Sequence, residues 1–391
     1  MATKVLTFLG ARLDKTKPPF KYKHEGTVYE GYAFAEALKQ FVKYDEMIVF
    51  VTDVAERDVW NHLPALNNDK KKRIRRVHIP TGDQPGDMWT LFETVVGQVD
   101  EADTVIFDVT QGLRSLPFLT FLFAAYLKSA KHVTISAVYY GAIELKDADG
   151  ASPVQDLSEF VDFLNWISAT DAFVRRGDGE DLAELLGDSE PDVTRIIRTI
   201  SLGLRTTRPY ETFSAAAELE DALTDKDWQR VASLRPFALI SPKLARDYQR
   251  FALASPTENQ QDALSRQLEL VAWYFDHEQF EQVATLATEW IVSALVFRFG
   301  GDVMNYHGYR STVEKALNGI NSEKYTPLLD NLPFRAELDT LWGHLKDIRN
   351  DIAHCGIRKK ADTIVNLQTR VAEAYKQFDE LAPKLIKVTT P

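Results

Sequence analysis

The sequence predicts two kinds of structure in one chain, an α/β domain over residues 1–155 followed by an all-α region. Two observations support this prediction. Up to about residue 155, short apolar runs alternate with segments whose apolar residues recur at helical spacing. Beyond that point the strand pattern disappears and helical spacing continues. A length of 391 residues suggests two or three domains, and 45% hydrophobic residues allow each to form a core.

Five continuous apolar runs are the expected strands of the first domain. They cover residues 5–9, 47–51, 77–79, 104–109 and 133–140. Helices are expected between them, at residues 33–41, 89–99 and 116–127. Strands that are apolar on both faces and alternate with helices are typical of a parallel sheet covered on each side, as in Rossmann-like folds. Ligands of such folds bind at the carboxyl ends of the strands.

The residues that follow these strands are therefore the candidate ligand-binding residues. We expect this set to be Gly10, Ala11, Arg12, Thr52, Asp53, Thr110, Gln111, Gly112, Leu113, Arg114, Tyr140 and Gly141. The loop at residues 108–115 is the most informative, because Gly112 lets the backbone approach a ligand. Arg114 and the free amides at the start of the next helix would attract a phosphate or a nucleotide edge. Ser115 is expected to cap that helix, which Pro117 helps to start.

A purely structural interpretation of this loop stays open. Asp108, Thr110 and Ser115 are also residue types that satisfy an ordinary strand-to-helix turn. The chain has neither the GxGxxG nor the Walker pattern, which argues against a simple NAD or ATP domain. The basic run at residues 70–76 is likewise either a solvated loop or a source of long-range attraction for an anion.

Two long helices are expected in the last part of the all-α region, at residues 280–299 and 336–355. Gly300 and Gly301 are expected to end the first helix, and Gly356 the second. The second helix carries Arg349 and His354, separated by four residues, near its carboxyl end. Spacing alone is weak evidence for a site, because the same spacing also occurs from Arg57 and from Arg73.

The chemistry of this helix end is the stronger argument. A histidine titrates near neutrality and acts as an acid or a base in cleavage of an RNA phosphodiester. Arg349 could hold the phosphate and stabilise the charge that develops on it, while the ribose 2′-hydroxyl serves as nucleophile without a metal. The alternative is that His354 only caps the helix and that Arg349 pairs with Asp347 or Asp351.

Composition limits the classes of function. The chain has 46 Lys and Arg against 57 Asp and Glu, a net charge of −11, which argues against a general nucleic-acid coat and confines such chemistry to a local basic pocket. The single Cys355 excludes an intrachain disulfide and a multi-thiolate zinc site. The amino terminus lacks the apolar stretch of a signal peptide, and residues 116–127 are far shorter than the ~20 residues that cross a bilayer. We expect a cytoplasmic protein that does not contact the membrane.

Four segments of the chain closely resemble a known family. Residues 4–10, 108–117, 139–142 and 156–166 resemble type III CRISPR-associated proteins that join a CARF sensor to a HEPN nuclease domain. The resemblance implies a CARF domain over residues 1–155, a helical connector over 156–265 and a HEPN domain over 266–391. Arg349, Asn350 and His354 match the HEPN catalytic motif, and Glu289 on the preceding long helix is a possible partner of Arg349.

The resemblance also implies an activity and its regulation. It implies a homodimer, or a larger assembly of dimers, that binds cyclic oligoadenylate across its two-fold axis and then cleaves single-stranded RNA in antiviral defence. Neither a metal nor another cofactor is expected, DNA is not an expected substrate, and cyclic tetra-adenylate is the favoured activator. The family often has a histidine at the position of Gln111, which leaves open the ring size and whether the sensor cleaves its activator. The competing interpretation is a non-catalytic regulator whose helical half dimerises or recruits a partner.

Overall fold

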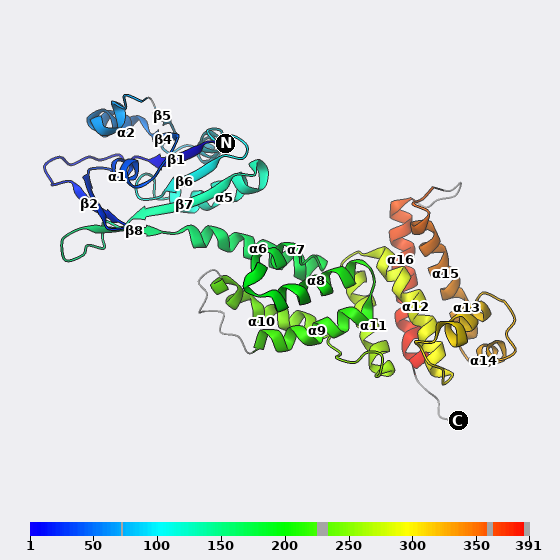
Figure 1. Cartoon of the computed structure of the whole chain (residues 1–391). Helices are drawn as coiled ribbons and strands as arrows, with labels where there is room; N and C mark the ends of the chain where they lie inside the picture. The colour runs from blue at the N-terminus through cyan, green and yellow to red at the C-terminus, as the bar shows by residue number, and fades with distance from the viewer. Residues whose placement is uncertain (72, 225–233, 358–362, 387–391) are drawn as a thin grey trace. The chain divides into compact units, whose positions relative to one another are not determined.

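The structure is a computed structural model that describes residues 1–71, 73–224, 234–357 and 363–386 (Figure 1). The chain divides into two compact units, Met1–Asn165 and Trp166–Pro391. The first is an α/β unit and the second is helical, so the predicted fold class is confirmed. The further separation of a connector from a nuclease domain at residue 265 stays a prediction.

A mixed sheet forms the centre of the first unit. Its strands are β1 (Thr3–Phe8), β2 (Phe20–His24), β3 (Thr27–Gly31), β4 (Glu46–Val51), β5 (Ile74–His78), β6 (Thr104–Asp108), β7 (Thr134–Gly141) and β8 (Ser152–Asp156). Their order is β3-β2-β8-β7-β6-β1-β4-β5. The run from β7 to β5 is parallel, as the sequence predicts. β8 pairs antiparallel with β7, and β2 pairs antiparallel with β3.

Three strands were not predicted, namely β2, β3 and β8. They extend the sheet beyond β7, where β2 runs parallel to β8. β2 has the sequence FKYKH, in which Tyr22 is fully buried while Lys21 and Lys23 on either side are exposed. This is the alternation of a strand with one covered face, and it lacks the continuous apolar run by which the other strands were recognised.

Helices cover both faces of the parallel part of the sheet. They are α1 (Phe34–Phe41), α2 (Asp53–Asp58), α3 (Pro64–Asn67), α4 (Asp87–Val96) and α5 (Leu116–Lys131), with a 3₁₀ turn at Trp60–His62. On β4, Met47 and Val49 enter the hydrophobic core that contains α1, whereas Ile48 and Phe50 enter the core that contains α5. β1, β4 and β6 are buried on both faces, which explains why continuous apolar runs predicted them. β5 differs, because it begins at Ile74, three residues before the predicted run at 77–79, and its Arg75 and Arg76 are exposed.

The second unit is built from helices. They are α6 (Ser158–Arg176, which begins in the first unit), α7 (Glu180–Leu186), α8 (Pro191–Arg205), α9 (Pro209–Thr224), α10 (Arg235–Gln249), α11 (Gln260–Asp276), α12 (Phe280–Arg298), α13 (Ser311–Leu317), α14 (Tyr325–Asp330), α15 (Arg335–Ala353) and α16 (Ile364–Ile386). Short 3₁₀ and π segments occur at Gly187–Ser189 and Tyr306–Arg310. The predicted helices at 280–299 and 336–355 correspond to α12 and α15.

Helix α12 is the centre of the last helical layer. It packs against α11, α15 and α16, and its Trp290 is fully buried against Phe378 of α16. By length and composition alone α12 could cross a membrane, but 67% of its most apolar window is buried inside the fold. Its apolar character is therefore explained by packing against its neighbours.

Candidate functional site

The order of the strands places the predicted ligand loops next to each other. β1 lies between β4 and β6, so the chain runs to β4 and β5 on one side of β1 and then returns to β6 on the other (Figure 1). In parallel sheets a crevice forms at such a switch point, at the carboxyl ends of the strands. The loops after β1 and β6 meet here, since a Cβ built on Gly10 would lie 3.9 Å from the Gly112 nitrogen.

Gly112 occupies a backbone position that a larger residue could adopt only with strain. Its φ is +112°, which L side chains rarely adopt. A Cβ at this position would lie 2.5 Å from Leu116 Cδ1 and 2.9 Å from Phe8 Cβ. The glycine therefore lets the loop fold closely over β1, and its predicted role in backbone approach to a ligand stays a prediction.

Hydrogen bonds join three strands directly beneath this loop. The Thr7 hydroxyl donates to Asp108 Oδ2 at 2.6 Å, and the Thr110 amide donates to Asp108 Oδ1 at 2.7 Å. The Gly141 amide donates to the Thr110 hydroxyl oxygen at 2.8 Å. Burial raises the pKa of the Asp108 carboxyl to about 6, and the hydrogen bonds from Thr7 and Thr110 only partly oppose this effect. The structural interpretation is thus correct for Asp108 and for the Thr110 side chain.

Ser115 does not act as expected. It occupies the N-cap position of α5, with Pro117 in the first turn, but its side chain forms no capping hydrogen bond. Its backbone is already in the right-handed helical region, with φ −77° and ψ −17°, whereas a capping side chain needs an extended backbone. The start of α5 nevertheless offers few free amides, because the Leu116 amide donates to the Leu113 carbonyl at 3.0 Å, Pro117 has no N–H and the Leu119 amide donates to the Ser115 carbonyl at 3.0 Å.

Several candidate side chains of the two loops remain available for binding. In the described part of the chain, Arg12, Gln111 and Arg114 form no side-chain hydrogen bond or ion pair. Arg12 and Arg114 are exposed, as is Ala11, while Gln111 and Leu113 are half-buried. The two neighbouring loops thus carry two unpaired guanidinium groups and an amide, which are donors suited to an anionic ligand that also carries hydrogen-bonding bases.

The remaining candidates lie on the same edge of the sheet but are used differently. Thr52 follows β4 and caps α2, its hydroxyl accepting from the Ala55 amide at 3.2 Å. Asp53 is exposed, with its carboxylate 3.3 Å from His78 Nδ1. Tyr140 donates its hydroxyl to Glu144 at 2.6 Å.

Gly141, the last residue of β7, is buried. A Cβ there would lie 2.8 Å from Phe34 Cδ2 and 3.0 Å from Tyr22 Cε1. Gly141 therefore allows α1 and β2 to pack against the end of β7. This is a packing role that its position at a strand end did not reveal.

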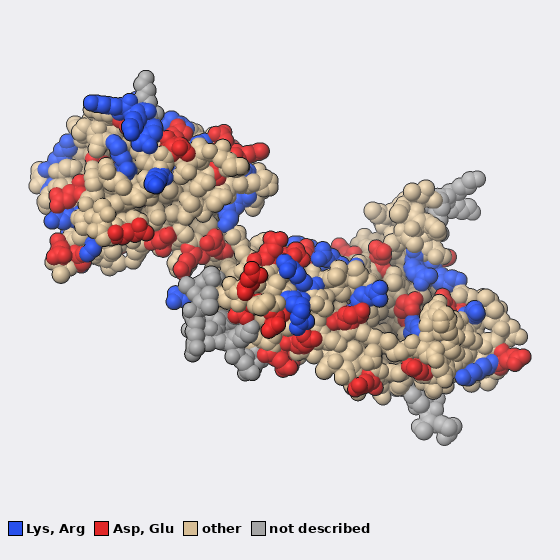
Figure 2. Space-filling model, in the orientation of Figure 1, with Lys and Arg blue, Asp and Glu red and all other residues tan. Residues whose placement is uncertain are grey.

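The interpretation of residues 70–76 as a solvated loop is wrong for the last three, because β5 already begins at Ile74. Figure 2 shows Lys and Arg side chains gathered over the part of the first unit where β5 and α2 lie. Arg75 pairs with Glu46, and Arg76 Nη1 lies 2.6 Å from Glu56 Oε1. Arg73 donates to the Tyr44 carbonyl at 3.2 Å. Lys72 lies outside the described residues. The arginines of this run therefore serve mainly to fix β5 to its neighbours.

The second candidate site is the carboxyl end of α15. The helix ends at Ala353, and His354 is its C-cap residue, with its amide 3.0 Å from the Asn350 carbonyl. Gly356, with φ +66°, terminates the turn as predicted. The His354 side chain is exposed, and Arg349 and Asn350 are half-buried. The helix thus carries all three predicted catalytic residues within its last turns.

Arg349 is not committed to a structural ion pair. It forms none with any residue in the described ranges, Asp347 and Asp351 included. The suggested pairing with Glu289 is wrong, because Glu289 Oε2 lies 2.5 Å from Arg310 Nη2. Arg310 is the last residue of the π turn that packs against α12, so it reaches Glu289 from a neighbouring segment.

The other two Arg/His spacings lie in ordinary fold contacts. Arg57 pairs with Asp58 at 2.7 Å, and His78 Nε2 lies 2.8 Å from Glu56 Oε2. Within the described ranges, no group of three or more His, Cys, Asp or Glu residues is arranged to hold a metal ion. Of the three arginine–histidine spacings, the one at the end of α15 is therefore the one in which neither side chain is held in an ion pair with a described residue, so both can contact a substrate.

A comparison with curated proteins gives a match to a CRISPR-associated protein. No protein-family model matches the chain. The chain is 21% identical over 326 residues to the CRISPR-associated protein MJ1674 of Methanocaldococcus jannaschii, an alignment that covers 82% of this chain and 49% of that protein. The chain therefore spans about half the length of the relative that it matches. The likeness supports a CRISPR-associated family and leaves the activity, the activator and the catalytic residues to be tested.

Proposed function

We propose that this chain is a homodimeric endoribonuclease of type III CRISPR defence that cyclic oligoadenylate activates and that cleaves single-stranded RNA without a metal. The first unit is the CARF sensor and the end of α15 belongs to the HEPN catalytic centre. The likeness to a CRISPR-associated protein supports the biological setting. The two sites found above support the division into a sensor and a catalyst.

The observation that carries the proposal is the state of the α15 carboxyl end. His354 is exposed at the C-cap, and Arg349 one turn earlier forms no ion pair within the described residues. In the proposed reaction the RNA 2′-hydroxyl loses its proton and attacks the adjacent phosphorus, and the bond to the 5′-oxygen breaks as that oxygen gains a proton. His354 transfers a proton or positions the 2′-hydroxyl, Arg349 binds the phosphate and Asn350 orients them.

The sensor role rests on the crevice between the loops after β1 and β6. Arg12, Gln111 and Arg114 offer unpaired donors there, and Gly112 lets the backbone come close to a ligand. Phosphates and adenine edges are the groups such donors recognise. Cyclic tetra-adenylate is our first choice of activator, with the tri- and hexa-adenylate rings as the alternatives to compare.

An exposed apolar stripe supports the homodimer. On α5, which begins directly after the ligand loop, Phe118 is 71% exposed, and Phe121, Leu122 and Tyr126 are also exposed. Their spacing of three and four residues places them on one face of the helix. In the proposed dimer, the same stripe on a second copy of the chain packs against this one and buries it. The dimer also supplies two copies of Arg349 and His354.

Regulation then follows from binding energy. Cyclic oligoadenylate must bind more tightly to the dimer in which the catalytic ends are productively arranged, since a ligand shifts an equilibrium only by its differential affinity. Arg114 lies just before α5, and α5 carries the apolar stripe. A ligand held by Arg114 therefore acts directly on the proposed dimer contact.

Cleavage of a labelled single-stranded RNA with EDTA present, measured with and without each cyclic oligoadenylate, tests the proposal. We expect activity that needs the activator and falls at least ~100-fold in His354→Ala, the range that a lost general acid–base group accounts for. His344→Ala is the matched control, because His344 is another exposed histidine of α15. It should retain activity.

Undiminished cleavage in His354→Ala would remove this residue from the mechanism. A chain that binds cyclic oligoadenylate but cleaves no RNA would favour the non-catalytic regulator. In that case His354→Ala should lower the melting temperature without any activity to lose. Arg114→Ala separates the sensor from the catalyst, since it should raise the activator concentration needed at least ~10-fold, the effect of losing a charge-assisted contact.

A further inference from the structure

A second concentration of positive charge lies on the helical unit, in a stretch from which no chemistry was predicted. A cleft of about 330 Å³ opens between the carboxyl ends of α10 and α11. Its lining includes Lys243, Arg246, Arg250 and His277, with Asp247 as the one acidic member. In a chain whose net charge is −11, four basic groups around one hollow are a marked local reversal of sign.

The two arginines of the cleft are not used by the fold as ion pairs. Arg246 and Arg250 are exposed, and within the described residues neither forms a salt bridge. Lys243 differs, since its ammonium lies 2.5 Å from Asp247 and so neutralises the one acidic residue of the lining. The cleft therefore retains two guanidinium groups whose charge no carboxylate of the described chain balances.

Both helices hold the cleft in a fixed shape. Tyr248 is buried, stacks on Phe173 at a centroid distance of 4.4 Å and donates its hydroxyl to the Phe173 carbonyl at 2.8 Å. The His277 ring stacks on Trp273 at 4.2 Å. A rigid floor reduces the entropy that a ligand must overcome when it is held by the long arginine side chains.

The His277 ring presents a defined atom to the cleft. Its Nδ1 lies 2.6 Å from the Trp273 carbonyl oxygen, which has no proton to give, so Nδ1 is the donor of this hydrogen bond. Nε2 is then left for a ligand. Nε2 of the neutral ring only accepts a hydrogen bond, so it donates to a phosphate oxygen only when the ring is protonated, whereas the two guanidinium groups always carry protons that they can donate to phosphate oxygens.

Helix stabilisation alone does not explain the arrangement. A cation near the carboxyl end of a helix is favourable, and Arg246 and Arg250 lie near the end of α10. That role requires neither a shared hollow nor a histidine from α11. The Arg250 guanidinium lies over the Phe251 ring at 4.8 Å, a contact that leaves its hydrogen-bond donors available at the cleft.

We infer that this cleft binds the phosphodiester backbone of the RNA strand. The inference rests on the proposed function, because it names a binding site for the same substrate class on the same unit. Figure 1 shows α10 and α15 at opposite ends of the helical unit, so the cleft is distinct from the end of α15. A single strand held at a remote basic site is a common way to raise affinity without sequence preference.

Binding of a fluorescent, 2′-O-methylated RNA strand to the full-length protein tests this inference, because the modification removes the nucleophile and allows binding to be measured without cleavage. Arg246→Ala/Arg250→Ala should weaken binding at least ~10-fold and reduce the slope of log affinity against log salt by about 0.7 for each lost phosphate contact. An unmodified DNA strand should show the same dependence, since phosphates alone are recognised.

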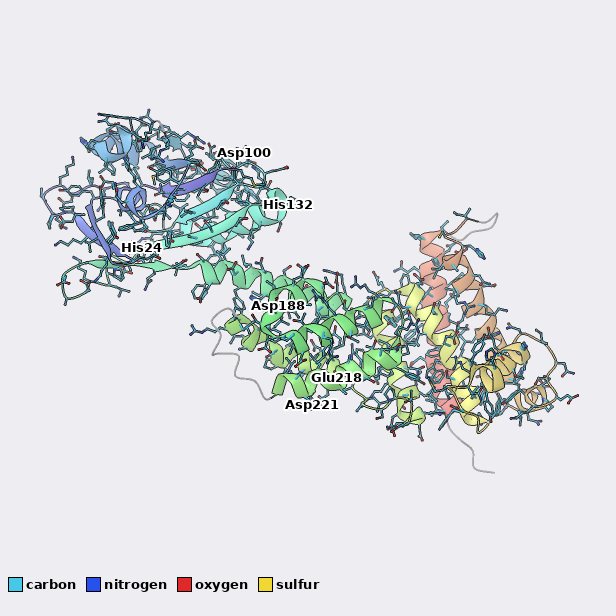
Figure 3. The ribbon with its side chains drawn as sticks, in the orientation of Figure 1. His24, Asp100, His132, Asp188, Glu218 and Asp221 are labelled. Atoms are coloured by element: carbon cyan, nitrogen blue, oxygen red, sulfur yellow. The ribbon has the colours of Figure 1, made fainter. Side chains whose placement is uncertain are left out.

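The matched control removes two arginines that do have partners. On α8, Arg195 Nη2 lies 2.7 Å from Glu218 Oε2, and Arg198 Nε lies 3.0 Å from Glu180 Oε1. Glu218 is labelled in Figure 3. Arg195→Ala/Arg198→Ala changes the net charge by the same amount and should leave RNA affinity within about twofold, because each of these arginines is already neutralised by a carboxylate.

The outcomes separate this inference from the proposed function. Unchanged affinity and salt slope in Arg246→Ala/Arg250→Ala, or an equal loss in the control variant, would overturn the cleft as an RNA site. Wild-type cleavage activity together with that result would leave the proposed function intact. Cleft-dependent RNA binding in a protein that cleaves nothing would support the cleft and contradict the ribonuclease.

Discussion

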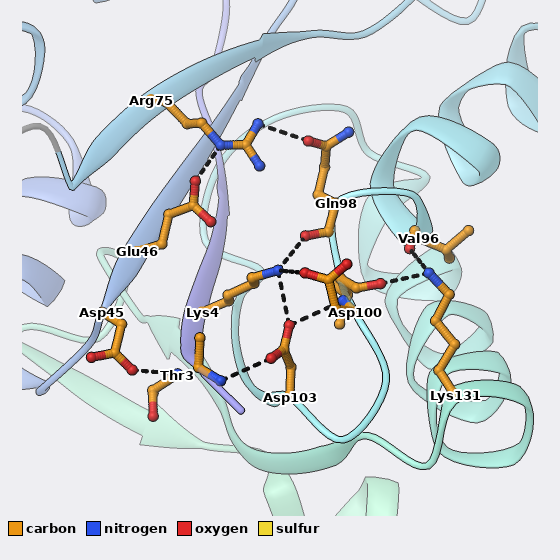
Figure 4. Close-up of polar contacts among 12 residues, drawn as sticks. Thr3, Lys4, Asp45, Glu46, Arg75, Val96, Gln98, Asp100, Asp103 and Lys131 are labelled. Atoms are coloured by element: carbon orange, nitrogen blue, oxygen red, sulfur yellow. Dashed lines mark hydrogen bonds and ion pairs between the residues drawn. The ribbon is translucent and has the colours of Figure 1, made fainter.

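The two ends of the parallel sheet are both polar, but they use their polar groups in opposite ways. At the amino end, the Lys4 ammonium lies 2.7 Å from Asp100 and 2.8 Å from Asp103, with only 7% of its side chain exposed (Figure 4). At the carboxyl end, Gln111 and Arg114 form no side-chain contact of this kind within the described residues. Charges that pair with each other inside the fold stabilise the strands, whereas hydrogen-bond donors without a partner among the described residues remain available to a ligand.

The amino end is connected to several elements. The Asp103 carboxylate also accepts from the backbone amides of Ala2 and Asp100, at 2.8 and 3.0 Å. Lys131, at the end of α5, donates to the carbonyl of Val96 at 2.8 Å. Figure 3 shows Asp100 at this end of the sheet, beside the amino terminus of the chain. β1, β6, α4 and α5 are thus joined by groups that leave little hydrogen-bonding capacity for a ligand.

The pKa shifts at the amino end describe when this network is stable. Burial alone would lower the pKa of Lys4, but Asp100 and Asp103 together raise it above 10.5. The contribution of Lys4 to the free energy of unfolding is therefore complete below pH 10.5 and is lost as the pH rises through the higher pKa of the folded state. For Asp103, burial would raise the pKa, but bonds from Lys4 and backbone amides lower it below 3.8. Its contribution is therefore present above 3.8 and is lost as the pH falls through the lower value.

Removal of the Lys4 charge should give the largest effect. Lys4→Met leaves Asp103 buried without its cation, and breaking a buried pair in this way costs about 3 to 5 kcal/mol. We expect a corresponding loss in the free energy of unfolding of the first unit, measured by urea titration at pH 7. Lys23→Met is the control, because its pair with Asp147 at 3.1 Å is partly exposed and should contribute less than about 1 kcal/mol.

If the Lys4→Met variant has the same free energy of unfolding as the wild type, the ion pairs of Lys4 stabilise the fold no more than an exposed surface pair does. That result would also remove the contrast between the two ends of the sheet. The cleavage assay gives a second comparison, since the surviving folded fraction of Lys4→Met should respond to the activator normally.

Asp108 is the structural group at the ligand end, and it should give an intermediate effect. Its pKa is raised from 3.8 to about 6, so the folded state binds a proton more tightly than the unfolded state and stability falls as the pH rises between these values. The full difference corresponds to about 3 kcal/mol. Asp108→Asn should therefore lose this part of the pH dependence and gain stability relative to the wild type at pH 7.

Urea titrations of both proteins at pH 4 and pH 7 measure the difference directly. If Asp108→Asn is destabilised equally at both values, the hydrogen bonds to Thr7 and Thr110 dominate over the cost of burying the charge. A normal response to the activator in the same variant would place Asp108 in the support of the loop, outside the ligand contact.

The strand-end rule predicted from sequence that the loops after β1 and β6 lie side by side, because continuous apolar runs identify buried parallel strands and their carboxyl ends share one edge. It could not show which polar groups were already used. Thr52 and Thr110 have the composition of ligand residues, but their hydroxyls bond to Ala55 and Gly141. That distinction depends on turn angles and side-chain directions, which spacing does not contain.

Contacts between residues far apart in the chain were the other feature that the sequence could not predict. Glu289 was suggested as a possible partner of Arg349, whereas in the fold Arg310 of the π turn pairs with it. The basic cleft was missed for the same reason, since Arg246 and His277 lie on different helices and converge only in the fold. By contrast, α12 and α15 were found within two residues of their bounds, because their apolar stripes and terminal glycines are local signals.

The smallest effect is expected for the exposed ion pair between Arg76, in the middle of β5, and Glu56 of α2. Arg76 and Glu56 are 44% and 21% exposed, and an ion pair of this kind contributes less than about 1 kcal/mol. Arg76→Gln should therefore change the free energy of unfolding by less than Lys4→Met at low salt, and the difference from wild type should vanish near 1 M NaCl because salt screens exposed charges. A loss that persists at high salt would mean that Arg76 holds β5 through more than its charge, and that a structural interaction like that of Lys4 also exists at the exposed edge of the sheet.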